Sequence, residues 1–411
     1  MSRKSILFLM NGLICGGVER AFLSSLSLID PEEFDVTCIF MRRKGDLFDN
    51  LPSWVRSFEL PLQPLDRVEY ENGRVAALKH AVKMFKFGFV LEMLLSRLYW
   101  RLFKHNQPYN YLRRIKLVHR AARSLPQDLP RKYDYVFAYG GMSMVSIVAK
   151  ELFKGRVECA WFHLESQPDY EGVFYYRKLY STFNRRFCCS QKLADQLNIK
   201  WNVASGARFE FLGFHLNTAL YMRMASSESG FVDDFKGFRI LTVGRLCEQK
   251  GWDIAIDACY ELKKKGYEIR WYWVGWGEHE IEKVRMRIRK MELNNDFILL
   301  GLKTNPFPFF KECDIYVQPS RFEGYCLTVA EARAFCRPIV CTDFAGASEQ
   351  IKNGHTGIIV PEVSADAICD GVRQLLDSKN LRENLSSALS TETVDNEQRV
   401  RSAWKKLLES V

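Results

Sequence analysis

The segment Ser320-Arg-Phe-Glu-Gly-Tyr-Cys-Leu-Thr-Val-Ala-Glu331 lies between an apolar run at 315–318 and the helical pattern of 326–335. The apolar run predicts a buried strand, and the polar, Gly-containing stretch after it predicts a turn. Glu323 lies in that turn, and Glu331 follows inside the helix. Strand, turn and helix in this order are the unit from which parallel α/β sheets are built.

The same alternation extends along the chain of 411 residues, which exceeds the usual size of one core. Apolar runs that predict buried strands fall at 6–10, 36–41, 135–139, 157–162, 187–189, 239–243, 269–274, 297–300, 315–318, 338–341 and 357–360. Helical patterns separate them, which predicts two doubly wound α/β domains. We expect an N-terminal domain at 1–215, a C-terminal domain at 216–390 and a final helix at 391–411.

The composition favours a cytoplasmic protein. None of the 12 cysteines forms a Cys-x-x-Cys pair, which favours a reducing compartment and argues against a metal cluster. The apolar run at 6–10 is too short for the core of a signal peptide, and we see no clean apolar stretch of about 18 residues. Membrane attachment, if present, is therefore expected to be peripheral, at the inner face.

The formal net charge of +10 is concentrated in one segment. Residues 71–125 hold 12 Lys/Arg and two acidic residues, which is also a net charge of +10. Within the predicted insert 66–130, Lys79, Lys83, Arg97 and Arg101 follow helical spacing among apolar residues. A solvated helical insert is one interpretation, but charge and apolar residues on shared helices favour an anionic membrane surface. Nucleic acid is not expected, because aromatic residues are not interleaved as stacking platforms.

Glu323 and Glu331 are candidate ligands for hydroxyl groups. A carboxylate accepts two hydrogen bonds side by side, which suits the adjacent hydroxyls of a ribose or hexose. The backbone N–H groups of 324–328 would lie at a helix N-terminus, which favours phosphate or sugar oxygens. Taken alone, two glutamates on a helix are more often simply solvated.

Arg245 and Lys250 follow the predicted strand 239–243 and are candidates for binding a diphosphate. Arginine can grip a diphosphate through two parallel hydrogen bonds, and lysine adds a point charge. The alternative is two exposed basic residues in a loop. The chain contains no Asp-x-Asp, so we expect these cations, and neither a metal nor a cofactor, to hold the diphosphate.

Two further features follow predicted strands of the first domain. Gly16 and Gly17 lie in a glycine-rich turn that allows close approach of a ligand, or simply tight packing of a helix on a strand. His163 ends the strand 157–162, at the edge where open parallel sheets bind ligands. A structural histidine is the alternative there.

These residues together resemble the GT-B glycosyltransferases of the large retaining family 4, which includes many enzymes of bacterial surface-polysaccharide synthesis. The matching parts are Gly16-Gly17-Val-Glu-Arg20, the strand ending in His163, Gly244-Arg245 with Lys250, Glu323 with Glu331, and Ala345-Gly346-Ala-Ser-Glu349. The resemblance implies two Rossmann-like domains facing each other across a cleft. The C-terminal domain would bind a UDP- or GDP-linked sugar, and the N-terminal domain a glycan or lipid-linked acceptor.

The resemblance also implies a role for each site residue. Glu331 would hold the ribose, Glu323 the transferred sugar, Arg245 and Lys250 the diphosphate, and His163 would line the reacting face. The remaining donor-binding residues would be Gly16, Gly17, Gly324, Tyr325, Cys326, Leu327 and Thr328. Cys326 stands where the family often has glycine.

The expected reaction is transfer of a sugar to an acceptor hydroxyl with retention of the anomeric configuration and without a metal. No carboxylate is evident as a nucleophile, so front-face attack is our mechanistic hypothesis. The alternatives are a non-catalytic nucleotide-sugar-binding subunit, a GT-B-like nucleotide-sugar epimerase and a sugar phosphorylase.

Overall fold

A computed structural model describes residues 3–14, 16–62, 107–140, 144–162, 179–201 and 208–410. Within these residues the strands form two separate parallel sheets, which confirms the predicted α/β class. The N-terminal sheet contains β1 (Lys4–Met10), β2 (Phe34–Phe40), β3 (Arg56–Glu59), β4 (Lys132–Tyr139), β5 (Lys154–Phe162), β6 (Arg185–Cys188) and β7 (Phe209–Phe211). Its strand order is β3-β2-β1-β4-β5-β6-β7, with parallel pairing throughout.

The helices described in the N-terminal half connect these strands or follow them. They are α1 (Gly17–Leu26), α5 (Gln107–Ala121), α6 (Met144–Leu152), α8 (Gln191–Lys200) and α9 (Thr218–Ala225). Their amphipathic patterns lay apolar residues against the sheet; α6, for example, buries Val145, Ile147 and Val148.

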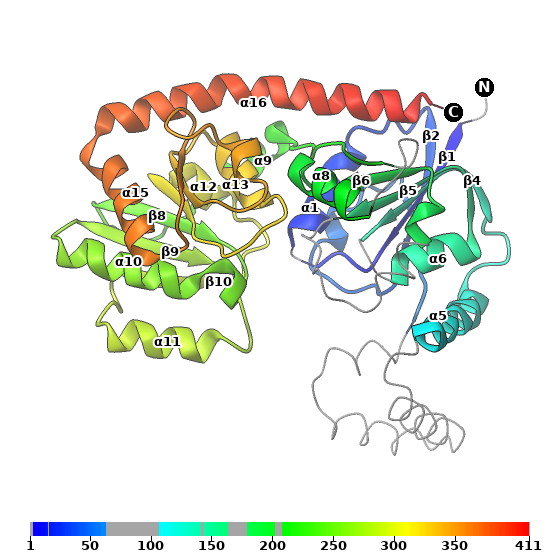
Figure 1. Cartoon of the computed structure of the whole chain (residues 1–411), viewed down its shortest axis with the longest axis horizontal. Helices are drawn as coiled ribbons and strands as arrows, with labels where there is room; N and C mark the ends of the chain where they lie inside the picture. The colour runs from blue at the N-terminus through cyan, green and yellow to red at the C-terminus, as the bar shows by residue number, and fades with distance from the viewer. Residues whose placement is uncertain are drawn as a thin grey trace, which may run out of the picture.

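The C-terminal domain lies beside the N-terminal domain in Figure 1 and repeats its architecture. Its sheet has the order β10-β9-β8-β11-β12-β13. Its strands are β8 (Phe238–Val243), β9 (Ile269–Val274), β10 (Phe297–Gly301), β11 (Ile315–Gln318), β12 (Ile339–Thr342) and β13 (Ile358–Val360). Its helices are α10 (Trp252–Lys264), α11 (Ile281–Lys290), α12 (Phe307–Glu312), α13 (Leu327–Ala334), α14 (Ala347–Gln350), α15 (Ala365–Asp377) and α16 (Lys379–Leu408).

Two short edge strands, β3 and β7, were not predicted from the sequence. The sequence of β3 is Arg-Ser-Phe-Glu and that of β7 is Phe-Glu-Phe. Each lies at an edge of the sheet, so neither needs the continuous apolar run that marks a strand buried on both faces.

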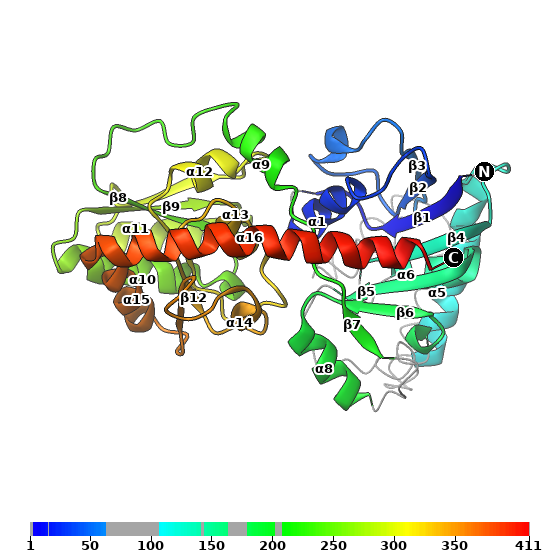
Figure 2. The same cartoon turned by 90° about the horizontal axis from the view of Figure 1, so that it is seen from above.

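The last helix, α16, is longer than the segment 391–411 predicted from its apolar face. It begins at Lys379, where the Ser378 hydroxyl caps the Leu381 N–H at 3.1 Å. Figures 1 and 2 both show α16 running along the C-terminal domain and onto the N-terminal sheet. There Trp404 packs on Trp161 with ring centroids 5.7 Å apart, and the Tyr135 hydroxyl donates to the Leu408 carbonyl at 2.7 Å. One continuous helix therefore ties the two domains together.

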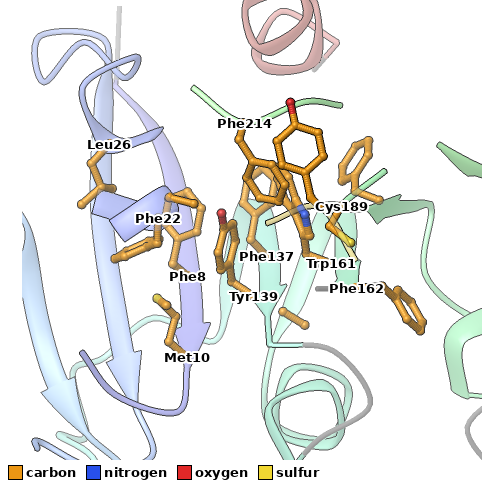
Figure 3. Packing of buried hydrophobic residues seen from close by; sticks show 14 of the residues in the cluster. Phe8, Met10, Phe22, Leu26, Phe137, Tyr139, Trp161, Phe162, Cys189 and Phe214 are labelled. Carbon is orange, nitrogen blue, oxygen red and sulfur yellow. The ribbon is translucent and has the colours of Figure 1, made fainter. Parts of the chain in front are cut away.

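The core of the N-terminal domain is rich in aromatic side chains from neighbouring parallel strands (Figure 3). Phe8 of β1 stacks on Phe137 of β4 at 4.8 Å, and Trp161 of β5 lies 6.1 Å from Phe214 in the segment after β7. The same buried cluster continues through Tyr325 and Val329 into the C-terminal domain. The domains thus share apolar contacts as well as a covalent link.

Candidate functional site

Glu323 lies in the loop between β11 and α13, where a buried network of polar groups holds its carboxylate. Its Oε1 accepts hydrogen bonds from Lys250 Nζ at 2.5 Å and from the Ser320 hydroxyl at 2.7 Å. Ser320 in turn accepts a hydrogen bond from the Gln318 side chain at 2.8 Å, and Tyr316 donates to Gln318 at 2.5 Å. Because Glu323 is only 7% exposed, this network fixes where its charge lies.

Lys250 is positioned by the sharp turn at the start of α10. Gly251 has φ +69°, and a Cβ on it would lie 2.0 Å from the Pro319 carbonyl oxygen, so glycine is required there. Burial disfavours the Lys250 ammonium, yet the Glu323 carboxylate beside it keeps the pKa of Lys250 above its usual value. The structure therefore pairs two residues to which the sequence analysis gave separate ligands.

Arg245 lies just after β8, in the loop that leads to Lys250. Its side chain is exposed and forms no hydrogen bond or ion pair with any residue that the structure describes. Its charge is near enough to act on Lys250 and on Glu19 of the N-terminal domain. The Arg245 guanidinium can therefore bind an anion without first breaking an ion pair with a described residue.

Glu331 is more deeply buried than Glu323, the other acidic residue predicted for the site. It lies on α13, is 2% exposed, and its carboxylate has no hydrogen-bond or ion-pair partner among the described residues. Burial raises the pKa of Glu331 from 4.5 to about 7, against the opposing charges of Arg20 and Lys250. A buried carboxylate with two cations nearby and unused acceptor capacity is suited to adjacent hydroxyl groups.

The N-terminus of α13 lies between these two glutamates. Cys326 adopts φ 68° and ψ 81°, the left-handed region that disfavours residues with a side chain. Of the described residues, none accepts a hydrogen bond from the backbone N–H of Leu327 or Thr328. The Thr328 hydroxyl donates to Gln318 at 3.0 Å, which joins α13 to the network beneath Glu323. This end of α13 thus offers N–H donors beside the site.

The N-terminal domain contacts this site through α1. A Cβ on Gly17 would lie 3.3 Å from Leu327 Cδ1, so the start of α1 packs on the start of α13. Arg20 donates to the Thr304 carbonyl at 2.8 Å, lies over the Phe307 ring, and acts electrostatically on Glu331. Burial raises the pKa of Glu19, against the opposing charge of Arg245. The glycines of this turn were predicted to approach the ligand, whereas Arg20, which follows them, makes the contacts with the C-terminal domain.

The remaining predicted residues fall in different places. Gly324 and Tyr325 lie in the loop between Glu323 and α13, with Tyr325 buried and 5.1 Å from the ring of Phe214. His163 lies outside the described residues, as do residues 63–106 of the basic insert.

Across the described residues there is no group of three or more His, Cys, Asp or Glu side chains that could hold a metal ion. No helix in that part of the chain is both long and apolar enough to cross a membrane.

The C-terminal half of the chain is similar to known glycosyltransferases. Residues 232–390 match the family model described as "Glycosyl transferases group 1". The chain is 23% identical over 232 residues to the capsular polysaccharide biosynthesis glycosyltransferase CapM of Staphylococcus aureus, covering 54% of this chain and 61% of CapM. It is 30% identical over 151 residues to the alpha-D-kanosaminyltransferase of Streptomyces kanamyceticus, covering 36% of this chain and 38% of that protein. The matched regions thus cover less than two thirds of these relatives.

Solved structures resemble the whole chain more evenly. Anabaena HepE in complex with UDP and glucose has a TM-score of 0.70 at 15% identity, covering 100% of both chains. A complex of Staphylococcus aureus TarM that contains UDP has a TM-score of 0.71 at 11% identity, covering 99% of this chain and 100% of that one. At these identities the likeness concerns the fold, which is the two-domain GT-B fold.

Proposed function

We propose that this protein is a glycosyltransferase of surface-polysaccharide biosynthesis that uses a UDP- or GDP-linked sugar. The observation that carries the proposal is the convergence at Glu331: a buried carboxylate without a hydrogen-bond partner among the described residues, near Lys250 and Arg20. The match of 232–390 to the group 1 family model and the glycosyltransferase names of the relatives also support this activity.

In this proposal the C-terminal domain, 216–390, binds the donor. Glu331 accepts from the ribose hydroxyls, and Arg245 with Lys250 binds the diphosphate. Glu323 contacts the transferred sugar, because it is held 2.5 Å from the Lys250 ammonium and therefore lies next to the bond that breaks. Gly324, Tyr325, Cys326, Leu327 and Thr328 supply backbone around the same ligand.

The N-terminal domain, 1–215, binds a glycan or lipid-linked acceptor. Gly16 and Gly17 bring backbone close to the donor, since a side chain at Gly17 would press on Leu327. His163 stays a prediction for the reacting face. The basic segment 71–125 would attach the protein to an anionic membrane at the cytoplasmic face, where lipid-linked acceptors are held.

The reaction we propose retains the anomeric configuration and needs no metal. The bond between the anomeric carbon and the donor phosphate oxygen breaks, while the acceptor oxygen bonds to that carbon from the same face. The acceptor proton passes to the departing phosphate oxygen. Negative charge grows on the diphosphate as the bond breaks, so the fixed charges of Arg245 and Lys250 stabilise the transition state. Positioning of the two substrates supplies much of the remaining rate.

A panel of UDP- and GDP-sugars tests this function. The purified protein is incubated with each donor and EDTA, and free UDP or GDP and new glycosides are measured by mass spectrometry. We expect donor-dependent release of one nucleotide, by slow hydrolysis without acceptor and faster with glycan acceptors. Nucleotide binding without release from any donor would contradict a transferase, and NMR of the product reports the anomeric configuration.

A further inference from the structure

Glu349 of α14 joins the C-terminal domain to a helix of the N-terminal domain. Its Oε2 accepts from the Gln191 backbone N–H at 2.9 Å, and its Oε1 accepts from the Lys192 N–H at 2.8 Å. Gln191 and Lys192 are the first two residues of α8, whose N–H groups have no partner within the helix. Figure 2 shows α14 and α8 at the boundary between the domains. The positive end of the α8 dipole adds to both hydrogen bonds.

The helix α8 does not depend on Glu349 for its own cap. Ser190 precedes the helix with extended backbone, and its hydroxyl accepts from the Leu193 N–H at 3.2 Å. This is the ordinary N-cap of a helix, supplied from within the same domain. The two hydrogen bonds of Glu349 therefore act between the domains and are not needed to start α8.

On its other side α14 touches the loop that follows Glu323. The Gln350 side chain donates to the Tyr325 carbonyl, and a Cβ on Gly346 would lie 2.8 Å from Tyr325 Cα. Tyr325 packs in turn on Phe214, in the segment that leads from the N-terminal sheet to α9. A four-residue helix thus contacts the candidate sugar-binding loop and the other domain at once.

We propose that Glu349 is a positioning residue that holds the domains in the arrangement that places α1 against α13. Its carboxylate binds the backbone of α8, and its neighbours Gly346 and Gln350 contact Tyr325 on the other side. Its effect on sugar transfer rests on the proposed function, whereas its effect on domain arrangement does not. Donor sugar bound at Glu323 would press on the same loop, so α14 would couple donor binding to the contact between the domains.

Two substitutions remove the contact from opposite sides. Glu349→Ala removes the carboxylate. Gln191→Pro removes one N–H donor at the first helical position, where proline is tolerated and where extended Ser190 suits a following proline. Glu362→Gln is the matched control, because Glu362 is exposed and forms no ion pair with any described residue.

Three measurements are made on the full chain: the radius of gyration by small-angle X-ray scattering, UDP affinity by calorimetry, and turnover of the donor that the wild-type protein uses. We expect both variants to increase the radius of gyration. We expect them to lower turnover about tenfold, because small displacements of the reacting groups are costly, with UDP affinity nearly unchanged. The double variant should be no worse than Glu349→Ala, because both changes break one contact.

The outcomes separate the two proposals. If both variants match Glu362→Gln in scattering and in turnover, the role of Glu349 is wrong, whatever the reaction. If the wild-type protein neither binds UDP nor consumes any donor, the proposed function fails, and scattering alone decides the role of Glu349. Fully additive losses in the double variant would show that the two residues act independently and would also overturn it.

Discussion

The two domains have the same architecture but bring different chemistry to their shared boundary. The C-terminal domain supplies charged side chains fixed by contacts within that domain, such as the Lys250–Glu323 pair and the hydrogen bond of Ser320. The N-terminal domain supplies a glycine turn and α1, whose Arg20 reaches the Thr304 carbonyl across the boundary. The first set keeps its geometry however the domains move, whereas the second acts only when they are in contact. Donor binding should therefore depend mainly on the C-terminal domain, and catalysis on both domains.

Substitution of Arg245 should have the largest effect and tests the role of the C-terminal domain. Arg245→Ala should lower donor turnover about 10²- to 10³-fold, the usual cost of removing one group that stabilises developing charge. The thermal unfolding midpoint should stay unchanged, because Arg245 is exposed and has no hydrogen-bond or ion-pair partner among the described residues. Arg285→Ala on α11 is the control, because Arg285 is exposed and forms an ion pair with Glu282 on the same helix. Near-normal turnover of Arg245→Ala would remove Arg245 from the diphosphate site.

Glu331 tests whether the C-terminal site stores an unfavourable charge. A pKa of about 7 instead of 4.5 means that the ionised form costs the folded state about 3 kcal/mol. This cost is absent below pH 4.5 and grows as the pH rises through 7, so the wild-type protein loses stability over that range. Denaturant unfolding of Glu331→Gln should show a stability gain over the wild type that is about 3 kcal/mol larger at pH 8 than at pH 4.5.

The same carboxylate sets the pH dependence of ligand binding. Ribose hydroxyls donate more strongly to the ionised form, so wild-type affinity for UDP should rise between pH 6 and pH 8. Glu331→Gln should bind UDP more weakly and without that rise, as measured by calorimetry. A pH-independent difference in stability, with parallel binding curves, would mean that Glu331 is ionised throughout.

Gly17 tests the contribution of the N-terminal domain. Gly17→Ala should lower turnover about tenfold by forcing α1 away from Leu327, since small displacements at an active site are costly. UDP affinity should fall much less than in Arg245→Ala, because Gly17 contributes only backbone to the donor site. Leu327→Val removes Cδ1, so adding it to Gly17→Ala should restore part of the turnover, with Leu327→Val alone as the control. If Gly17→Ala and Arg245→Ala lost UDP affinity equally, donor binding would not be a property mainly of the C-terminal domain.

Cys326 carries the smallest expected effect. Its left-handed backbone costs a residue with a Cβ about 1–2 kcal/mol, whereas glycine adopts it freely at some cost in chain entropy. Cys326→Gly should therefore raise the stability of the protein by about 0.5 kcal/mol, seen as a small rise in the unfolding midpoint. Cys326→Ala loses the thiol but keeps the strain and should show no such rise. A loss of stability in Cys326→Gly would mean that the thiol contact with Thr328 outweighs the strain.

Much of the fold could be predicted from the sequence, because central parallel strands are buried on both faces. The runs at 6–10 and 239–243, for instance, were recognised as strands that the structure places near the centre of each sheet. The edge strands β3 and β7 and the first 12 residues of α16 were missed, because each is partly exposed and lacks a continuous apolar signal.

The candidate site could be predicted only as a set of residue types. Patterns and family resemblance identified Lys250 and Glu323 as site residues. They did not indicate that the two form an ion pair, because 73 positions of sequence separate them. Nor did any pattern indicate that Arg20 would lie near Glu331, or that Glu349 would bind α8. Such contacts join different elements, and local periodicity carries no information about them.

The sequence by itself determined the alternation of strands and helices and the chemical groups at the strand ends, because these follow from local burial and turn propensity. The tertiary structure alone decided which charges meet, how deeply Glu331 is buried, and how α14 and α16 tie the domains together. The physical reason is that pairing and desolvation depend on distances between segments that only the folded chain brings close.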